Sequence, residues 1–470
     1  MKKLVKLVCI MLSCMCMIQT PIIHASSTTD SADWPNGPKA SSIAAESAIV
    51  MEASTGLVLY EKKVDKKQYP ASITKIMTAL LVLENCSLDE VVTFSREAVY
   101  GIETGSSHIA VEVGEKLTIE QCLYAIMLES ANEVCLGVAE HIAGSISGFV
   151  DMMNARAKEL GCTNTHFVNP NGLHDDDHYT TAHDMALISQ AAIANETFRT
   201  ITGTKKYTIP ATNKKEARSW ISNHHQMLTG FKYPKYLYDY CIGGKTGYTM
   251  KAQSTLVTFA EKDGMTLICV VLKDLGPYYA ENEYTDTTSL FEYCFDKFSL
   301  YQAASEEDGA VEANTSLFAK YSGLLNVENP LIYVDKNTNV ILPKDASFED
   351  LEQDITYYGE TSFEEGENVI GTVSYTYKNK VVGTGNIIYN AKNITQLTTS
   401  TDVLANTETV PLNKGSGPNV NQIAIVIAVV VVGFGIIYYV FVIQKRRRKN
   451  AYYKQRRQNY YSNRRNYDDY

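Results

Sequence analysis

Ser72 and Lys75 lie three residues apart in a stretch of sequence that is predicted to begin a helix. Residues at positions i and i+3 share one helix face, so the lysine amine can take the proton of the serine hydroxyl. A serine hydroxyl becomes an effective nucleophile only when a neighbouring base activates it. A lysine serves as that base only when burial or a nearby cation lowers its pKa. Taken alone, the spacing is also that of an ordinary helix.

Two further short motifs carry residue types that fit acyl-transfer chemistry. Ser130 and Asn132 lie between two predicted helices, where the hydroxyl can relay a proton to a leaving group and the amide can orient a substrate. The alternative for this motif is a helix-capping turn. The segment 243–247 (GGKTG) is predicted on a strand, where small residues let an extended substrate approach the backbone. There Lys245 and Thr246 can hold a carboxylate, and the alternative is a glycine-rich hairpin.

The elements that must position these motifs alternate between helix and strand over residues 43–297. Capping and alternation patterns indicate an α/β (α+β) domain with a mostly antiparallel sheet flanked by helices. The expected strands are 47–52, 56–60, 255–260 and 265–272, and the expected helices are 70–84, one that follows the capping box Thr118–Gln121, and 133–142.

Residues 300–395 change to short predicted strands and indicate a small β-rich domain. Lys378 and Asn379 predict a tight hairpin between two of these strands. The polar residues 396–421 that follow predict a flexible linker. The expected strands are 332–334, 339–342, 368–377 and 380–389.

Both ends of the chain are basic and adjoin an apolar run, whereas the whole chain has a net charge of −10, which argues against nucleic-acid binding. Residues 1–25 match a secretory signal peptide. Residues 422–443 predict one transmembrane helix, because an uncharged run of this length spans a bilayer of about 30 Å. The basic tail 444–470 favours a cytoplasmic C-terminus, which places the rest of a cell-membrane protein on the extracytoplasmic side.

The spacing of the cysteines does not support a zinc or redox motif. Of the ten cysteines, three fall in the predicted signal peptide, and the other seven form no CxxC pair and are expected to be buried free thiols. The run from His174 to His178, with His183 and Asp184 beyond it, carries metal-ligand residue types. The preceding segment 169–172 (NPNG) disfavours a helix there, so this run is expected to be a solvated loop without a metal.

The three motifs each occur once, in the order S-x-x-K, S-x-N and K-T-G, in a chain predicted to be exported. This ordered set resembles the penicillin-recognising serine enzymes, and within them the low-molecular-mass penicillin-binding proteins that are serine-type D-alanyl-D-alanine carboxypeptidases. The likeness covers residues 43–297 and includes the segments 69–80, 165–173 and 182–186. The β-rich domain resembles the second domain of this family more loosely. Glu133 stands where many relatives carry aspartate, with little expected effect.

The resemblance implies that Ser72 attacks the penultimate D-alanine carbonyl of a peptidoglycan stem pentapeptide and that water then hydrolyses the acyl-enzyme, with no cofactor. β-Lactam antibiotics are implied as inhibitors that acylate the same serine. Lys75 is implied as the general base, and backbone N–H groups of Ser72 and Tyr248 as the oxyanion hole. The implied catalytic residues are Ser72, Lys75 and Ser130, and the implied substrate-binding residues are Asn132, Lys245, Thr246, Gly247 and Tyr248.

Three other functions fit part of the pattern. A β-lactamase with these motifs needs a glutamate between the second and third motifs, and residues 160–195 contain none. A D,D-endopeptidase or transpeptidase acting on the same peptides is compatible with the motifs. An inactive membrane-tethered module that binds the wall or senses antibiotics fits poorly, because every catalytic residue type is present. The sequence makes no prediction of the oligomeric state.

Overall fold

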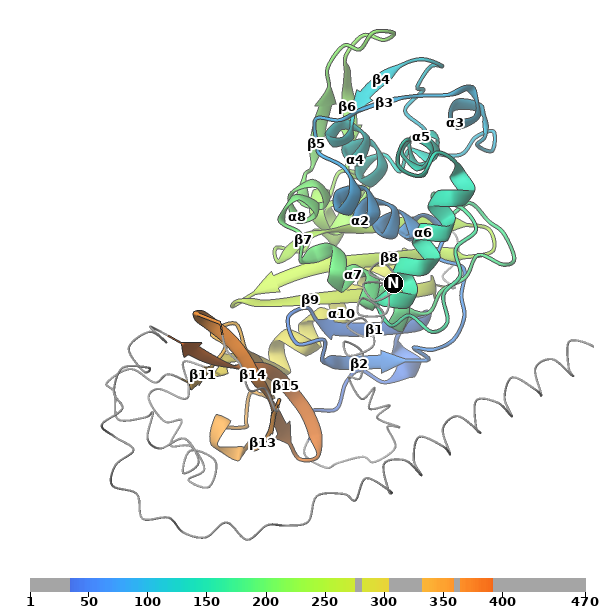
Figure 1. Cartoon of the computed structure of the whole chain (residues 1–470). Coiled ribbons are helices and arrows are strands. Elements are labelled where there is room, and N and C mark those ends of the chain that lie inside the picture. The colour runs from blue at the N-terminus through green and yellow to red at the C-terminus, as the bar shows by residue number, and fades with distance from the viewer. Residues whose placement is uncertain (1–33, 275–280, 304–331, 359–363, 392–470) are drawn as a thin grey trace, which may run out of the picture. The chain divides into compact units, whose positions relative to one another are not determined.

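The computed structural model describes residues 34–274, 281–303, 332–358 and 364–391 (Figure 1). All of them lie in the first of the two compact units into which the chain divides, Met1–Ile394. The predicted signal peptide, linker, transmembrane segment and basic tail lie outside the described residues. Among the residues that are described, no helix has both the length and the apolar character needed to cross a bilayer.

A five-stranded antiparallel sheet forms the centre of the larger part of the structure, with the strand order β2-β1-β9-β8-β7 (Figure 1). The predicted strand pairs at both ends of this region are confirmed, and the segment GGKTG lies on a strand as expected. The strands are β1 (Ala45–Glu52), β2 (Val58–Lys62), β7 (Cys241–Thr249), β8 (Gln253–Lys262) and β9 (Met265–Asp274).

Both faces of this sheet are buried, and alternate residues of each strand face opposite ways. Ile49 of β1, Val257 of β8 and Val270 of β9 belong to a core that also contains the apolar faces of the helices between β2 and β7. Their chain neighbours, such as Val50 and Val271, pack on the other side with the last helix before the β-rich part. The central strands are therefore nearly continuous apolar runs, which is why they could be predicted.

The helices that carry the motifs begin and end close to their predicted limits. The predicted helix 70–84 begins as a 3-10 turn, Ala71–Thr74, and Ala71 has a positive φ of 51°, which lies outside α-helical geometry. Thr118 and Gln121 form the expected capping box, and Gly144 in the left-handed conformation ends the third predicted helix. The helices are α2 (Lys75–Asn85), α3 (Arg96–Tyr100), α4 (Ile119–Leu128), α5 (Asn132–Ala143), α6 (Ile146–Glu159), α7 (Ala182–Ile193), α8 (Glu196–Gly203), α9 (Gln226–Thr229) and α10 (Asn282–Lys297), with 3-10 turns η1 (Ala40–Ser42), η2 (Ala71–Thr74), η3 (Pro234–Tyr236) and η5 (Phe348–Asp350).

The β-rich part contains a four-stranded antiparallel sheet in the order β11-β15-β14-β13. Lys378 and Asn379 have φ values of 47° and 67°, as a tight hairpin with two left-handed residues requires. The strand β13 was not expected, because its residues are mostly exposed and show no apolar alternation. These strands are β11 (Ile332–Val334), β13 (Glu352–Tyr357), β14 (Gly366–Tyr377) and β15 (Lys380–Ala391), while β10 (Phe298–Gln302) pairs with β12 (Asn339–Pro343).

Two hairpin-like strand pairs beside α4 were missed by the sequence analysis, namely β3 (Val91–Thr93) with β4 (Lys116–Thr118) and β5 (Lys206–Ile209) with β6 (Arg218–Ser222). A buried ion pair holds them together. Arg218 Nη1 lies 2.8 Å from Glu115 Oε1, and its Nε donates a hydrogen bond of 2.9 Å to the carbonyl of Ile109. A buried charge destabilises the fold strongly when its partner of opposite charge is removed.

We predict that Arg218→Met lowers the free energy of unfolding by about 3–5 kcal/mol, because it leaves the Glu115 carboxylate buried without its cation. Denaturant unfolding measures this change. Lys215→Met is the matched control, because Lys215 Nζ lies 2.7 Å from Glu112 Oε1 at the surface. An exposed pair of this kind contributes about 1 kcal/mol or less. Equal effects of the two substitutions would contradict the interpretation.

Candidate active site

Ser72 lies in the 3-10 turn that precedes α2, and residues of two strands hold this turn, Gly247 of β7 and Thr255 of β8. Thr255 Oγ1 donates a hydrogen bond of 2.8 Å to the carbonyl of Pro70. A Cβ atom added to Gly247 would lie 2.9 Å from the backbone nitrogen of Ser72, so only glycine permits this approach. The predicted nucleophile and the third motif are therefore in direct backbone contact, although 175 positions separate Ser72 from Gly247 in the chain.

The Lys75 amine is fully buried and lies among three oxygen atoms. Its Nζ is 3.0 Å from Ser72 Oγ, 2.7 Å from Asn132 Oδ1 and 2.5 Å from the backbone oxygen of Asn171. No carboxylate of the described residues forms an ion pair with this amine. The first and second motifs thus meet at one nitrogen atom, as their residue types predict.

Burial lowers the pKa of Lys75 from 10.5 to about 8, because the ammonium form loses its hydration without gaining an ion-pair partner. A neutral amine has two hydrogens and one lone pair. The hydrogens match the two oxygen acceptors Asn132 Oδ1 and Asn171 O, which leaves the lone pair for the Ser72 hydroxyl proton. This arrangement suits a general base.

The second motif occupies the turn between α4 and α5. Ser130 has a positive φ of 60°, a conformation that costs a non-glycine residue about 1 kcal/mol or more. Its Oγ is buried but has no hydrogen-bond partner in the described part of the chain. Buried hydroxyl groups are normally paired. An unpaired one in a strained turn beside Asn132 is available to a substrate.

Glu133 follows the motif and supports the segment that covers it. Its Oε1 accepts hydrogen bonds from the backbone N–H of Ile109 at 2.8 Å and of Val111 at 3.5 Å. Burial raises the pKa of this carboxyl above its usual value. The neighbouring Asn132 N–H donates to the carbonyl of Ser107 at 2.9 Å. Glu133 therefore acts on the position of Asn132 through the segment 107–111.

The third motif lies on β7, the outer strand of the five-stranded sheet. Lys245 is buried, and its Nζ donates a hydrogen bond of 2.9 Å to the backbone oxygen of Thr246. Burial holds the pKa of Lys245 well below its usual value, and the nearby Lys75 acts in the same direction. Thr246 is half-buried and Tyr248 is half-exposed, so both border the solvent side of the strand.

The loop 169–173 completes the site, and the sequence analysis gave it no role. Asn171 supplies the backbone oxygen that contacts Lys75. Gly172 has a φ of 82°, and a Cβ atom there would lie 1.9 Å from the oxygen of Ala71. Thr78 of α2 donates a hydrogen bond of 2.5 Å to the carbonyl of Pro170. A backbone oxygen has no side-chain signature, so only the resemblance of the segment 165–173 pointed to this loop.

The run from His174 to His178 forms a loop, as predicted, but it is not uniformly solvated. His178 is buried, with Nε2 2.9 Å from Thr74 Oγ1 and Nδ1 accepting a hydrogen bond of 3.1 Å from the N–H of Val168. Burial lowers the pKa of His178 to about 3, so the ring is neutral. Both ring nitrogens are occupied, which leaves neither for a metal. His178 instead fixes the turn that carries Ser72.

The partly exposed Ser72 bonded to the buried Lys75, the second buried lysine and the mixed fold define a serine acyl-transfer enzyme of the penicillin-recognising class. A comparison with protein families matches residues 34–276 to the D-alanyl-D-alanine carboxypeptidases of peptidase family S11. The chain belongs to this family. The resemblance and the enzyme class expected from the sequence are therefore confirmed.

Curated relatives and solved structures agree with this assignment. The chain is 34% identical over 271 residues to D-alanyl-D-alanine carboxypeptidase DacF of Bacillus subtilis, covering 57% of this chain and 66% of that one. It is 32% identical to the D-alanyl-D-alanine carboxypeptidase of Streptomyces sp., covering 54% of this chain and 88% of that one.

Two solved structures share the fold. The Streptomyces K15 DD-transpeptidase aligns with a TM-score of 0.50 at 32% identity, over 56% of this chain and all of that one. Penicillin binding protein 5 from Haemophilus influenzae aligns with a TM-score of 0.57 at 24% identity, over 76% of this chain and 98% of that one. The second alignment covers more of the chain than the family match, so it supports a shared fold that extends into the β-rich part.

We predict that Gly172→Ala slows acylation of Ser72 by a labelled penicillin at least about 100-fold, because a displacement of about 1 Å at a reacting group has this effect. The added methyl group would collide with Ala71, the residue before Ser72. The acylation rate measures the effect.

Gly161→Ala is the matched control for this substitution. Gly161 has a similar φ of 86°, but a Cβ atom there would approach only Leu187, at 3.9 Å. The Gly161→Ala variant therefore has the same backbone strain of about 1 kcal/mol as Gly172→Ala, but its added methyl group collides with no neighbour. Equal acylation rates in the two variants would contradict a role of the loop 169–173 in positioning Ser72.

Proposed function

We propose that this chain removes the terminal D-alanine from peptidoglycan stem pentapeptides through an acyl-enzyme on Ser72. The observation that supports this most directly is the position of Lys75 Nζ, 3.0 Å from Ser72 Oγ in a buried environment without a carboxylate partner. Membership of the D-alanyl-D-alanine carboxypeptidase family supplies the substrate class. β-Lactams are proposed to acylate the same serine.

In the proposed acylation step, the Ser72 oxygen bonds to the substrate carbonyl carbon while Lys75 takes the hydroxyl proton. Ser130, whose buried Oγ is unpaired, is proposed to donate its proton to the nitrogen of the departing D-alanine as the C–N bond breaks, and to receive in exchange the proton that Lys75 accepted. Water then attacks the ester carbonyl, Lys75 takes a proton from this water, and that proton passes to Ser72 Oγ as the ester C–O bond breaks. Asn132 is proposed to hold the substrate backbone beside this centre.

Lys245 and Thr246 are proposed to bind the terminal carboxylate of the substrate. The Lys245 amine is buried beside another lysine, which makes its charged form unfavourable in the free enzyme. A substrate carboxylate would supply the missing countercharge and raise the pKa of Lys245. The chain has no arginine between Arg218 and Arg446 that could take this role from the region after Lys245.

The backbone N–H groups of Ser72 and Tyr248 are proposed as the oxyanion hole. The support is the close approach of Gly247 to the backbone nitrogen of Ser72. Tyr248 follows Gly247 directly, so its backbone N–H lies near the Ser72 N–H. Donors fixed in advance stabilise the charge that develops on the carbonyl oxygen. Strand β7 is the outer strand of the five-stranded sheet, so an extended substrate peptide is proposed to lie along this edge of the sheet.

We propose the domain organisation that the sequence predicts: a signal peptide (1–25), a catalytic domain (43–297), a β-rich domain (300–395), a linker (396–421), one transmembrane helix (422–443) and a cytoplasmic tail (444–470). The support for the anchor is the uncharged run and the basic residues after it. In this topology the active site faces the cell wall, where its substrate is located.

The pH dependence of acylation tests the role of Lys75. With a pKa of about 8, only the deprotonated fraction of Lys75 can accept the proton of Ser72. We expect the second-order rate of penicillin acylation to rise about tenfold per pH unit below pH 8 and to level off above it. Melting temperatures over the same pH range separate this effect from unfolding. A rate that is flat between pH 6 and 8 would exclude Lys75 as the base.

The function itself is tested by D-alanine release from a stem pentapeptide. Ser72→Ala should abolish release and penicillin labelling, whereas Ser42→Ala, which alters an exposed serine in another 3-10 turn, should change neither. Rapid turnover of penicillin would indicate a β-lactamase instead. Product joined to an added amine acceptor, without free acid, would indicate a transpeptidase. Unchanged D-alanine release in Ser72→Ala would refute the proposal.

A further inference from the structure

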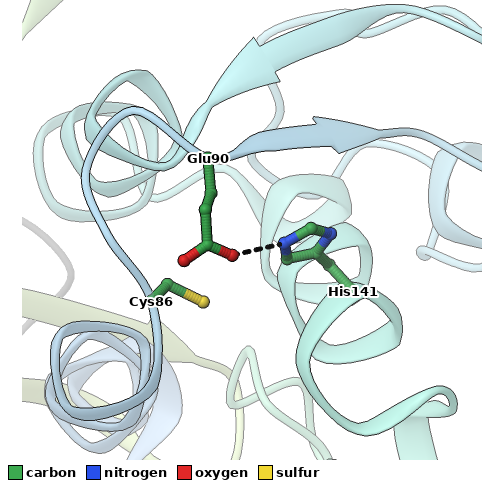
Figure 2. A group of neighbouring side chains, drawn as sticks. All are labelled: Cys86, Glu90 and His141. Carbon is green, nitrogen blue, oxygen red and sulfur yellow. Dashed lines mark hydrogen bonds and ion pairs between the residues drawn. The ribbon is translucent and has the colours of Figure 1, made fainter.

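Cys86, Glu90 and His141 come together near the surface (Figure 2). One ligand atom from each, the Cys86 Sγ, a Glu90 carboxylate oxygen and a His141 ring nitrogen, all lie within 4.8 Å of one another. His141 Nε2 is 3.3 Å from Glu90 Oε2. No other group of three such residues in the described ranges converges in this way.

The separations are close to those that a tetrahedral metal ion requires. Zinc binds thiolate sulfur at about 2.3 Å and imidazole nitrogen or carboxylate oxygen at about 2.0–2.2 Å. Neighbouring ligands of such an ion lie roughly 3.3–3.7 Å apart. The His141–Glu90 pair already has this spacing. The Cys86 sulfur lies within 4.8 Å of the other two ligand atoms, so it would need to move closer by about 1 Å at most.

The local backbone holds the carboxylate in a suitable orientation. Ser87 N–H donates a hydrogen bond of 2.6 Å to Glu90 Oε1, which leaves Oε2 directed at His141. An outer hydrogen bond of this kind orients a ligating carboxylate. Cys86 is half-buried, whereas Glu90 and His141 reach solvent, so a fourth position is open to water. Thiolate, imidazole and carboxylate together favour zinc over calcium or magnesium.

The site lies at the far ends of the two helices that carry the catalytic lysine and asparagine. Helix α2 begins at Lys75 and ends one residue before Cys86, and α5 begins at Asn132 and carries His141 in its last turn. At the opposite ends, Lys75 Nζ donates a hydrogen bond of 2.7 Å to Asn132 Oδ1. A metal ion at the surface site would therefore cross-link the same two helices about 16 Å from Lys75.

We propose that Cys86, Glu90 and His141 form a zinc site that clamps the C-terminal ends of α2 and α5. The ion displaces the proton of the Cys86 thiol, which leaves to solvent. The metal has a stabilising role and takes no part in the reaction of Ser72. Burial and the nearby Glu90 raise the pKa of the Cys86 thiol, so without a metal the group is a neutral thiol and a poor nucleophile.

The test is a cobalt titration of the full chain, purified under reducing conditions. Co²⁺ replaces Zn²⁺ in such sites and gives a thiolate-to-metal absorption band. We expect one equivalent to produce this band and Zn²⁺ to remove it. Cys86→Ser should abolish the band, and His141→Ala should weaken cobalt binding at least tenfold. Cys162→Ser is the matched control, because Cys162 is the other half-buried free cysteine among the described residues. The cobalt band of this variant should be unchanged.

Two further measurements make every outcome decisive. Penicillin acylation at the normal rate shows that each variant is folded, because none of these residues belongs to the catalytic site. Saturating Zn²⁺ should raise the melting temperature of the wild type by roughly 5 °C and leave that of Cys86→Ser unchanged. No band in the wild type, or a band that survives in Cys86→Ser, would overturn the proposal, and so would its loss in Cys162→Ser.

Discussion

The removal of the Lys75 amine from water is the constraint on which the rest of the site depends. An ammonium group without a counterion is costly to bury, so the protein favours the neutral form of this amine. Two oxygens, from Asn132 and from the backbone of Asn171, satisfy its hydrogens and direct its lone pair to Ser72. An ion pair with a carboxylate would instead favour the charged form of the Lys75 amine, which cannot act as a base.

Chain segments far apart in sequence must meet to create this environment. The central sheet provides the rigid edge, because β7 places Gly247 against the Ser72 nitrogen and Lys245 beside Lys75. The helices α2 and α5 bring Lys75 and Asn132 together at their first residues. The buried His178 ties the nucleophile turn to Val168, which directly precedes the loop that carries Asn171. The strained backbone at Ala71 and Ser130 is held by this surrounding core.

The sequence predicts the parts of this arrangement that local physics determines. The spacing of Ser72 and Lys75, the capping box at Thr118 and the apolar runs of the central strands follow from helix and strand geometry. The contribution of Asn171 is a backbone oxygen, which leaves no mark in the sequence. Arg218 and Glu115 are separated by a long stretch of chain, and charged residues are normally exposed, so their burial as a pair is a property of the tertiary structure. Cys86, Glu90 and His141 likewise show no motif spacing.

A direct titration of Lys75 tests whether burial makes this amine neutral near physiological pH. Isotopically labelled lysine side chains in the full chain report the charge of each amine by nuclear magnetic resonance, and the signal that Lys75→Met removes is that of Lys75. We expect this signal to titrate at about 8. A Lys75 signal that titrates at its ordinary value of 10.5 would show a charged amine at neutral pH and would rule out Lys75 as a base made neutral by burial.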